Sequence, residues 1–391
     1  MELIQRPSSI RNICIVLAAA PAIGFLAARL WRLASQEPIQ TRLSIYRAPR
    51  DFEGESNLPY PPNALPGARD IETPYGVTRA YEFGPEDGRK VLLIHGISTP
   101  CLSMACLAKV LSANGCRVCC YDLLGRGLSD APNPSTHRQD FALFSSQIFA
   151  VITSSPLDWC GEGFSIVGYS LGGGIATCFA SYFPKLVHSL VLLAPAGVIR
   201  PGRMTRASEF IYGGYLPEAV VERLVTMRMK LTGGEPALRS PPAADAAPVI
   251  ASTITNETPD PATSNGGWIE TFEGVRICPD KAVEWQLDFH PGFIPSFVST
   301  LRNGPIYDNH ERLRIIGRRC EISSGSLAER QVLLILGKQD TVILAKDTVE
   351  DMSNALGKNN IKVVELPGGH DLPIVNSVGC ADAMLDFWGS A

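Results

Sequence analysis

Short, nearly continuous apolar runs alternate with helix-length segments over most of this chain. The runs predicted as strands are Asp70–Thr73, Val77–Phe83, Val91–Ile94, Arg117–Tyr121, Phe164–Val167, Ser189–Leu193, Val332–Leu336 and Lys362–Leu366. The first two are expected to form an antiparallel pair. The others have the composition of parallel strands that are covered by helices on both faces. The pattern therefore predicts an α/β fold with an eight-stranded, mostly parallel, doubly wound sheet.

Composition limits the class of protein further. Of the 391 residues, 45% are hydrophobic and 19% are charged, and the formal net charge is -4. Nucleic-acid-binding proteins carry a basic face that neutralises phosphates, so no nucleic-acid partner is expected. The length suits two or three domains, and it equally suits one large α/β domain with an insertion.

One interval breaks the alternation of runs. More than a hundred residues separate Leu193 from Val332, and two segments in this interval, residues 208–231 and 285–301, have helical apolar spacing. Between them, Ser240 to Gly267 contains five prolines and neither Lys nor Arg. Such a stretch favours a flexible insertion over a separate domain. We therefore predict a helical lid, inserted at about residues 199–325, over the carboxyl edge of the sheet.

The N-terminal segment, residues 1–36, has a different character. Residues 12–28 contain no charge and are flanked by arginines on both sides. A helix of this length spans about 25 Å, and residues 29–33 can extend it towards the roughly 30 Å of a bilayer core. We predict a single-pass signal-anchor that gives membrane association through residues 12–33. The balance of positive charges places the rest of the chain on the cytosolic side. A cleaved signal peptide, a mitochondrial targeting segment and a helix packed on the domain are the alternatives.

Residues 37–68 contain six prolines and little periodicity. This composition predicts an extended, Pro-rich tether or surface wrap that leads into a domain starting at residue 69.

The chain has eleven cysteines, an odd number with irregular spacing. Cys116 and Cys119 are spaced like half of a metal site, but they lie in a predicted strand, where residues three apart face opposite sides. We therefore expect reduced, buried cysteines, as in a cytosol-facing domain, and no metal site.

The strongest motif follows the run Phe164–Val167 directly. Residues 168–172 read Gly-Tyr-Ser-Leu-Gly, the G-x-S-x-G pattern of a nucleophile elbow. The sharp strand-to-helix turn would expose the hydroxyl of Ser170 above the sheet. Gly168 and Gly172 leave room for the turn, and the backbone N–H of Leu171 would point towards an oxyanion. Ser170 is therefore the candidate nucleophile.

Two further polar residues follow later strands in the order that this motif requires. Asp340 comes after the run Val332–Leu336, and His370 comes just beyond the final strand. Both are expected at the carboxyl edge of the sheet, where α/β folds place their sites. His370 would act as the general base for Ser170, and Asp340 would orient and stabilise its imidazole. Asp371 adjoins His370, but neighbouring side chains diverge, so it is a poor orienting residue.

The loop after Val91–Ile94 supplies the second oxyanion donor in this interpretation. It reads His95-Gly96-Ile97-Ser98-Thr99-Pro100. Gly96 permits close approach of the substrate, and the Ile97 N–H is the expected partner of the Leu171 N–H. We interpret His95 as a residue that shapes this loop. The segment Asp122–Ser129, which reads DLLGRGLS, is interpreted as a structural turn near the pocket, because it lacks the Lys-Ser/Thr of a phosphate-binding loop.

Taken together, these motifs resemble the α/β-hydrolase superfamily, in particular its HG…GxSxG…D…H serine hydrolases. The resemblance covers about Asp70 to Trp388. It implies the α/β-hydrolase fold over residues 69–391, a covalent acyl-enzyme mechanism without a cofactor, and the roles given above for Ser170, Asp340 and His370. A serine at the nucleophile position disfavours the branches that use an aspartate.

We expect a carboxylic-ester hydrolase of the carboxylesterase or lipase-like kind. The apolar candidate lid helices suggest a small apolar acyl substrate, either lipid-like or a specialised metabolite. Three alternatives stay open: an acyltransferase with the same triad, a carbon–carbon bond hydrolase in which Arg302 and Trp285 bind substrate, and a ligand-binding protein. The oligomeric state is not indicated by the sequence.

Overall fold

The computed structural model describes residues 45–49, 60–200, 210–232, 269–272, 274–321, 327 and 331–389. The chain divides into two units, residues 1–44 and residues 45–391, and the described residues all belong to the second. The fold and the site below are those of this second unit.

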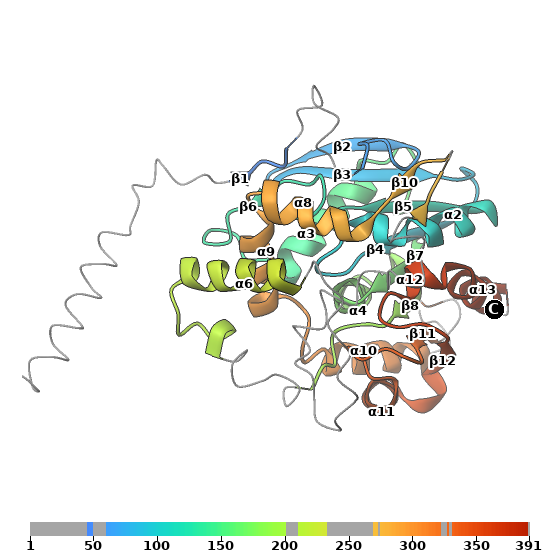
Figure 1. Ribbon diagram of the computed structural model, residues 1–391. Coiled ribbons are helices and arrows are strands. Elements are labelled where there is room, and N and C mark those ends of the chain that lie inside the picture. Colours follow the sequence, from blue (N-terminus) through green and yellow to red (C-terminus); the bar gives the residue numbers. More distant parts are fainter. Residues whose placement is uncertain are drawn as a thin grey trace, which may run out of the picture. The chain divides into compact units, whose positions relative to one another are not determined.

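An eight-stranded sheet forms its centre (Figure 1), with the strand order β12-β11-β8-β7-β4-β5-β3-β2. The strands are β2 (Ala68–Thr73), β3 (Gly76–Phe83), β4 (Arg89–Ile94), β5 (Cys116–Tyr121), β7 (Phe164–Tyr169), β8 (Val187–Leu193), β11 (Val332–Gly337) and β12 (Ile361–Leu366). β3 is antiparallel to both of its neighbours, and the other adjacent pairs are parallel. The predicted eight-stranded, mostly parallel sheet is therefore confirmed.

Helices form a layer on each face of the sheet (Figure 1). One layer contains α2 (Ala105–Ala113), α12 (Leu372–Val375) and α13 (Ser377–Gly389), and the other contains α3 (Phe141–Thr153), α4 (Leu171–Tyr182), α10 (His310–Glu321) and α11 (Ala345–Leu356). The chain runs from β4 to β5 in one direction across the sheet and then reverses towards β7 and β8. Right-handed crossovers place the connecting helices of the two directions on opposite faces. Every residue of β7 and β11 is buried, as expected for strands covered on both sides.

Among the described residues of the insertion between β8 and β11, three helices pack on one another: α6 (Glu218–Thr232), α8 (Pro279–Phe289) and α9 (Phe293–Asn303). They lie together at one side of the sheet (Figure 1). A short antiparallel pair, β9 (Ile269–Glu270) and β10 (Arg276–Ile277), precedes α8. α10 falls within the range predicted for the lid, but it packs against α4 and α11 and so belongs to a layer that covers the sheet.

Part of the segment predicted as a Pro-rich tether belongs to the packed domain. β1 (Ile45–Tyr46) pairs with β6 (Ala131–Pro132), and the Ala48 amide donates to the buried Asp130 carboxylate at 2.9 Å. Further along, Tyr60 and Leu65 are buried in the core. Residues 60–67 form turns, and the large apolar side chains of Tyr60 and Leu65 are buried although the segment is rich in proline. The domain therefore begins before residue 69.

Ten cysteines fall within the described residues, all of them free and eight of them buried, which agrees with the expected core cysteines. In the same residues, no group of His, Cys, Asp and Glu is arranged to hold a metal ion. The search for a helix long and apolar enough to cross a membrane likewise found none in the part of the chain that the structure describes. The anchor predicted over residues 12–33 lies outside the described residues and stays a prediction.

Candidate active site

Ser170 occupies a sharp turn between β7 and α4. Its backbone has φ 51° and ψ -118°, a left-handed conformation that is strained for a residue with a side chain. The surrounding chain holds this conformation in place: the Ser170 N–H donates to the Leu193 carbonyl at 3.0 Å, and the Ser170 carbonyl accepts from the Ala196 N–H at 2.8 Å. The predicted nucleophile elbow is thus present in the backbone.

The two glycines of the motif allow the backbone to pass very closely on either side of the serine. A Cβ atom on Gly168 would lie 2.2 Å from the Gly172 carbonyl oxygen. A Cβ atom on Gly172 would lie 2.1 Å from the Ile94 carbonyl oxygen at the end of β4. The first turn of α4 therefore packs directly against the start of the loop that follows β4.

The side chains of Ser170, His370 and Asp340 form one hydrogen-bonded chain. His370 Nε2 lies 3.0 Å from Ser170 Oγ, and His370 Nδ1 lies 2.9 Å from Asp340 Oδ2. The other carboxylate oxygen, Asp340 Oδ1, accepts the N–H groups of Val342 and Ile343, both at 2.8 Å. The Asp340 and His370 side chains are fully buried. This is the order and geometry that proton transfer from a serine through an oriented histidine requires.

Asp371 lies beside this triad without replacing Asp340. Burial raises the pKa of its carboxyl to about 6. The His370 Nδ1 hydrogen bond goes to Asp340. The structure therefore brings together the three predicted triad residues and gives the orienting contact to the predicted aspartate.

The two expected oxyanion donors come shortly after the ends of neighbouring strands. β4 and β7 are parallel neighbours, with Ile94 opposite Gly168. Ile97 lies three residues after Ile94, and Leu171 lies three residues after Gly168. Leu171 is the first residue of α4, where backbone N–H groups lack intrahelical acceptors and attract negative charge.

His95 supports the loop that carries Ile97. Its Nδ1 donates to the Gly96 carbonyl, and its Nε2 accepts the Leu123 N–H, both at 2.8 Å. Burial, together with the nearby positive charge of Arg126, lowers the pKa of His95 to about 3, so the ring is neutral. Because the peptide unit is planar and trans, a held Gly96 carbonyl also fixes the direction of the Ile97 N–H. These contacts agree with the interpretation of His95 as a residue that shapes the loop.

The segment Asp122–Ser129 is a buried turn next to this loop. The Asp122 carboxylate accepts the N–H groups of Cys101 and Leu128, each at 2.9 Å. Arg126 of the same turn reaches the Ile97 carbonyl with its Nε at 3.0 Å. The interpretation as a structural turn near the site is confirmed.

Two residues that contact this region were not singled out in the sequence. Gln286 of α8 donates to the Ser98 carbonyl at 3.0 Å, and Thr300 of α9 accepts from Arg126 Nη2 at 2.9 Å. Their partners lie more than a hundred residues earlier in the chain. In the sequence, each is only a polar side chain within the helical apolar pattern of residues 285–301. That pattern does not indicate which distant residue the side chain contacts.

Arg302 and Trp285, considered as substrate contacts for carbon–carbon bond cleavage, are engaged in packing of the insertion. The Arg302 Nε donates to the Tyr212 carbonyl at 3.2 Å, and its Nη1 lies 3.6 Å from a carboxylate oxygen of Glu218. Trp285 is buried, with its ring beside that of Phe289. Arg302 therefore links α9 to α6, and Trp285 is a buried packing residue of α8.

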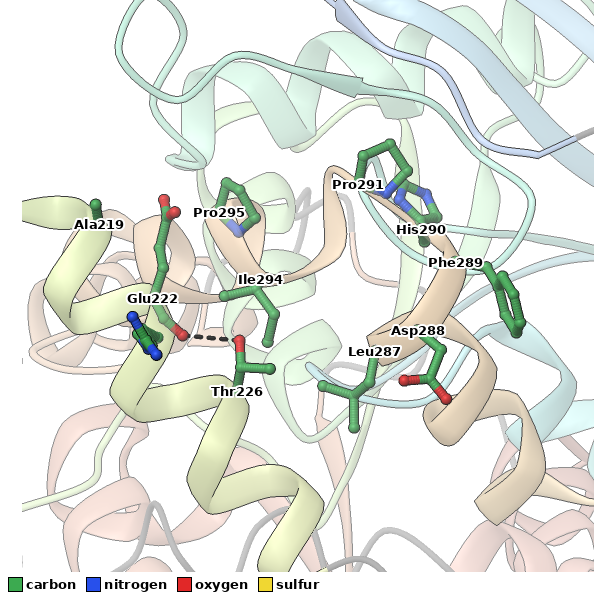
Figure 2. Close-up of a pocket in the computed structure, with 11 residues that line it drawn as sticks. Ala219, Glu222, Thr226, Leu287, Asp288, Phe289, His290, Pro291, Ile294 and Pro295 are labelled. Atoms are coloured by element: carbon green, nitrogen blue, oxygen red, sulfur yellow. Dashed lines mark hydrogen bonds between the residues drawn. The ribbon is translucent and has the colours of Figure 1, made fainter.

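A groove of about 450 Å³ lies between α6 and the α8–α9 segment. In Figure 2, Leu287 and Ile294 face the groove opposite Glu222 and Thr226 of α6. Burial and the neighbouring Glu218 raise the pKa of Glu222. No triad residue lines this groove, so it is separate from the hydrogen-bonded chain at Ser170.

The fold and the site define an α/β protein with a serine-hydrolase triad. The family model described as the alpha/beta hydrolase fold matches residues 90–377. The chain belongs to this family, as the sequence motifs had suggested.

Relatives and solved structures agree with this assignment. A serine hydrolase-like protein of Dictyostelium discoideum is 24% identical, over 79% of this chain and 77% of its own. A serine hydrolase-like protein of Danio rerio is 33% identical over 33% of this chain, and the match spans 38% of that relative's length. The crystal structure of a hydrolase from Pseudomonas aeruginosa is 18% identical, with a TM-score of 0.54 over 82% of this chain and 98% of that one. This likeness shows the fold.

Proposed function

We propose that this hydrolase cleaves carboxylic esters through a covalent acyl-enzyme formed on Ser170. The observation that carries the proposal is the continuous chain from Asp340 through His370 to Ser170, with the serine in a strained elbow. A buried histidine bonded on one side to a carboxylate and on the other to a hydroxyl is suited to nucleophilic catalysis.

In the first half-reaction, His370 Nε2 accepts the Ser170 proton as Oγ attacks the ester carbonyl carbon. The N–H groups of Ile97 and Leu171 receive the negative charge that develops on the carbonyl oxygen. The imidazolium, stabilised by Asp340, then gives its proton to the departing alcohol. Water repeats these steps on the acyl-enzyme and releases the acid.

We further propose that the substrate has a small apolar acyl group and that α6, α8 and α9 act as its lid. Support comes from the apolar character of these helices. Leu224 and Met227 of α6 are exposed apolar side chains on one of these helices. Exposed apolar side chains on a lid suit a lipid-like ligand.

Activity-based labelling tests the proposal directly. The full chain should react with a fluorophosphonate and hydrolyse p-nitrophenyl esters, and Ser170→Ala should lose labelling and at least about 10⁴-fold in rate. Undiminished labelling of Ser170→Ala would reject the site. An ester chain-length series tests the apolar acyl group. Product analysis with a competing alcohol separates hydrolysis from acyl transfer, since a transferase would form the new ester.

Membrane association through residues 12–33 is a separate proposal. It is supported by the uncharged apolar run between flanking arginines. Fractionation of the full chain between membranes and the aqueous phase tests it, and release by salt alone would contradict a spanning anchor.

A further inference from the structure

Three successive carbonyl groups of the oxyanion loop, residues 95–100, each accept a hydrogen bond from a different side chain. The Gly96 carbonyl accepts from His95 at 2.8 Å. The Ile97 carbonyl accepts from Arg126 Nε at 3.0 Å, and the Ser98 carbonyl accepts from Gln286 Nε2 at 3.0 Å. The first donor lies in the loop itself, the second lies in the 122–129 turn, and the third lies on the inserted helix α8.

Gln286 joins the loop to the turn with both ends of its amide. Its Nε2 donates to Ser98, and its Oε1 accepts the Gly127 N–H at 2.6 Å. The side chain is buried. One residue of α8 therefore bridges the oxyanion loop and the turn that carries Arg126.

The second inserted helix reaches the same network through Arg126. This guanidinium is fully buried, and its Nη2 donates to Thr300 Oγ1 of α9 at 2.9 Å. Thr300 Oγ1 in turn donates to the Ser296 carbonyl of its own helix at 2.7 Å. α8 and α9 thus each provide one partner for the polar groups around the oxyanion loop.

These bonds restrict the backbone where the proposed donor lies. His95 and Arg126 hold the carbonyls on either side of Ile97, so both peptide planes of this residue are fixed. Gln286 holds the next plane. A buried carbonyl or amide that loses its partner is costly, so withdrawal of α8 would favour rearrangement of the loop and the turn. Such a rearrangement would move the Ile97 N–H relative to Ser170.

We propose that Gln286 is a positioning residue for the oxyanion hole, acting on the loop through Ser98 and on Arg126 through Gly127. In this arrangement the inserted helices hold the loop in its catalytic conformation. The inference rests on the proposed function, because it concerns the donor that would stabilise the tetrahedral intermediate.

The test compares Gln286→Met with Gln139→Met in the full chain. Methionine keeps the length of glutamine and removes the amide. Gln139 is a matched control: it is also buried and bonded to α9, through Ser296 at 3.2 Å, with no hydrogen bond to residues 95–100 among its described contacts. Two quantities are measured: kcat and KM on a p-nitrophenyl ester, and the affinity for a trifluoromethyl ketone, whose adduct with the serine carries an oxyanion.

We expect Gln286→Met to lower kcat about 10- to 100-fold with little change in KM. This loss of kcat is smaller than the ~10²–10³-fold loss that follows removal of an oxyanion donor itself. The affinity for the trifluoromethyl ketone should fall by a similar factor, because both quantities report stabilisation of the oxyanion. Gln139→Met should leave both within about twofold of the unsubstituted protein, since it keeps the hydrogen bonds of Gln286 to Ser98 and Gly127 and that of Arg126 to Thr300.

Equal effects of the two substitutions, or an unchanged inhibitor affinity in Gln286→Met, would overturn the inference. If Gln286→Met does not fold, Thr300→Val is measured instead, because it removes the acceptor for Arg126. Both kcat and the inhibitor affinity should then fall together, several-fold. Unchanged values would reject the proposal. Fluorophosphonate labelling keeps the two hypotheses apart. Unsubstituted protein that does not label rejects the proposed function, whereas labelling of Gln286→Met at the unsubstituted rate rejects only the positioning role.

Discussion

At the scale of single residues, the two oxygens of the Asp340 carboxylate have different partners. Oδ1 accepts two backbone N–H groups, from Val342 and Ile343, and Oδ2 faces His370 Nδ1. In Asp340→Asn, the backbone donors would select the amide oxygen for the Oδ1 position and turn the NH₂ group towards His370. Nδ1 would then have to accept, which places the imidazole proton on Nε2, where a base is needed. We expect kcat to fall by about 10⁴-fold while the fold is kept.

Ester hydrolysis by purified Asp340→Asn, with a thermal unfolding curve, checks this expectation. Asp371→Asn is the matched control, because Asp371 is the adjacent buried carboxyl without the Nδ1 contact. Its activity should stay within about tenfold of the unsubstituted protein. Equal losses in the two variants would mean that Asp340 does not set the tautomer.

The residues of the triad could be found in the sequence because each follows a strand within a short local motif. Ser170 lies in G-x-S-x-G, and Asp340 and His370 come just after the last two strands of the sheet. Gln286 and Thr300 have no such marker. Each contacts its partner across more than 150 residues of chain, and only the packing of the insertion brings the groups together.

At the scale of elements, the contact between α4 and the end of β4 determines where the oxyanion loop starts. A Cβ atom on Gly172 would lie 2.1 Å from the Ile94 carbonyl oxygen and 2.8 Å from that of His95. Both oxygens belong to the backbone, so the steric clash can be relieved only if α4 or the loop moves. We expect Gly172→Ala to lower the free energy of unfolding by about 1–3 kcal/mol. It should also lower activity, because the loop shifts relative to Ser170.

Denaturant unfolding and ester hydrolysis measure the two effects. Gly389→Ala serves as the control, since a Cβ at the end of α13 meets nothing within 4 Å. That substitution should change stability by less than about 1 kcal/mol. Full activity in Gly172→Ala would show that the loop tolerates displacement from α4.

The strands of the sheet were predictable because burial on both faces demands continuous apolar runs, as in β7 and β11. The inserted helices were harder to orient. In α6, Val221 and Val225 are buried while Val220 and Leu224 are exposed, so apolar residues lie on two faces and the pattern alone does not select one. The segment before residue 69 was predicted as a tether because it is rich in proline. It has only a few apolar side chains, such as Leu65, that pack into the core, and they form no recognisable pattern.

At the scale of the whole molecule, two buried neutral histidines link stability to pH. Burial is the main cause in both cases, lowering the pKa of His95 to about 3 and that of His290 to about 4. His290 Nε2 donates to the Ser129 carbonyl at 2.8 Å, and Nδ1 accepts the Gly292 N–H at 3.1 Å. Protonation would remove that acceptor and place a charge in the interior. Asp371 changes stability with pH in the opposite direction. Its pKa is raised to about 6 in the folded state, so the folded state binds this proton more tightly than the unfolded chain does.

The sign of the histidine contribution follows from proton uptake. An unfolded histidine titrates near 6.5, whereas folded His290 titrates near 4, so between these values the unfolded chain binds more protons. Stability from this group is therefore complete above pH 6.5 and is lost as the pH falls towards 4. The loss is about 1.4 kcal/mol for each pH unit in that window. His290→Asn has no titrating group there and keeps an acceptor that can reach the Gly292 N–H.

We therefore expect the unsubstituted protein to be the more stable of the two at pH 8, by the value of the lost Ser129 hydrogen bond. Its advantage should shrink steadily below pH 6.5. Taking the difference between the two proteins cancels the opposing contribution of Asp371 and the parallel one of His95, which both share. Urea unfolding at intervals from pH 8 to pH 4.5 gives this difference. Parallel stability curves would mean that His290 is protonated in the folded state, and that the interior around Ser129 accommodates a charge.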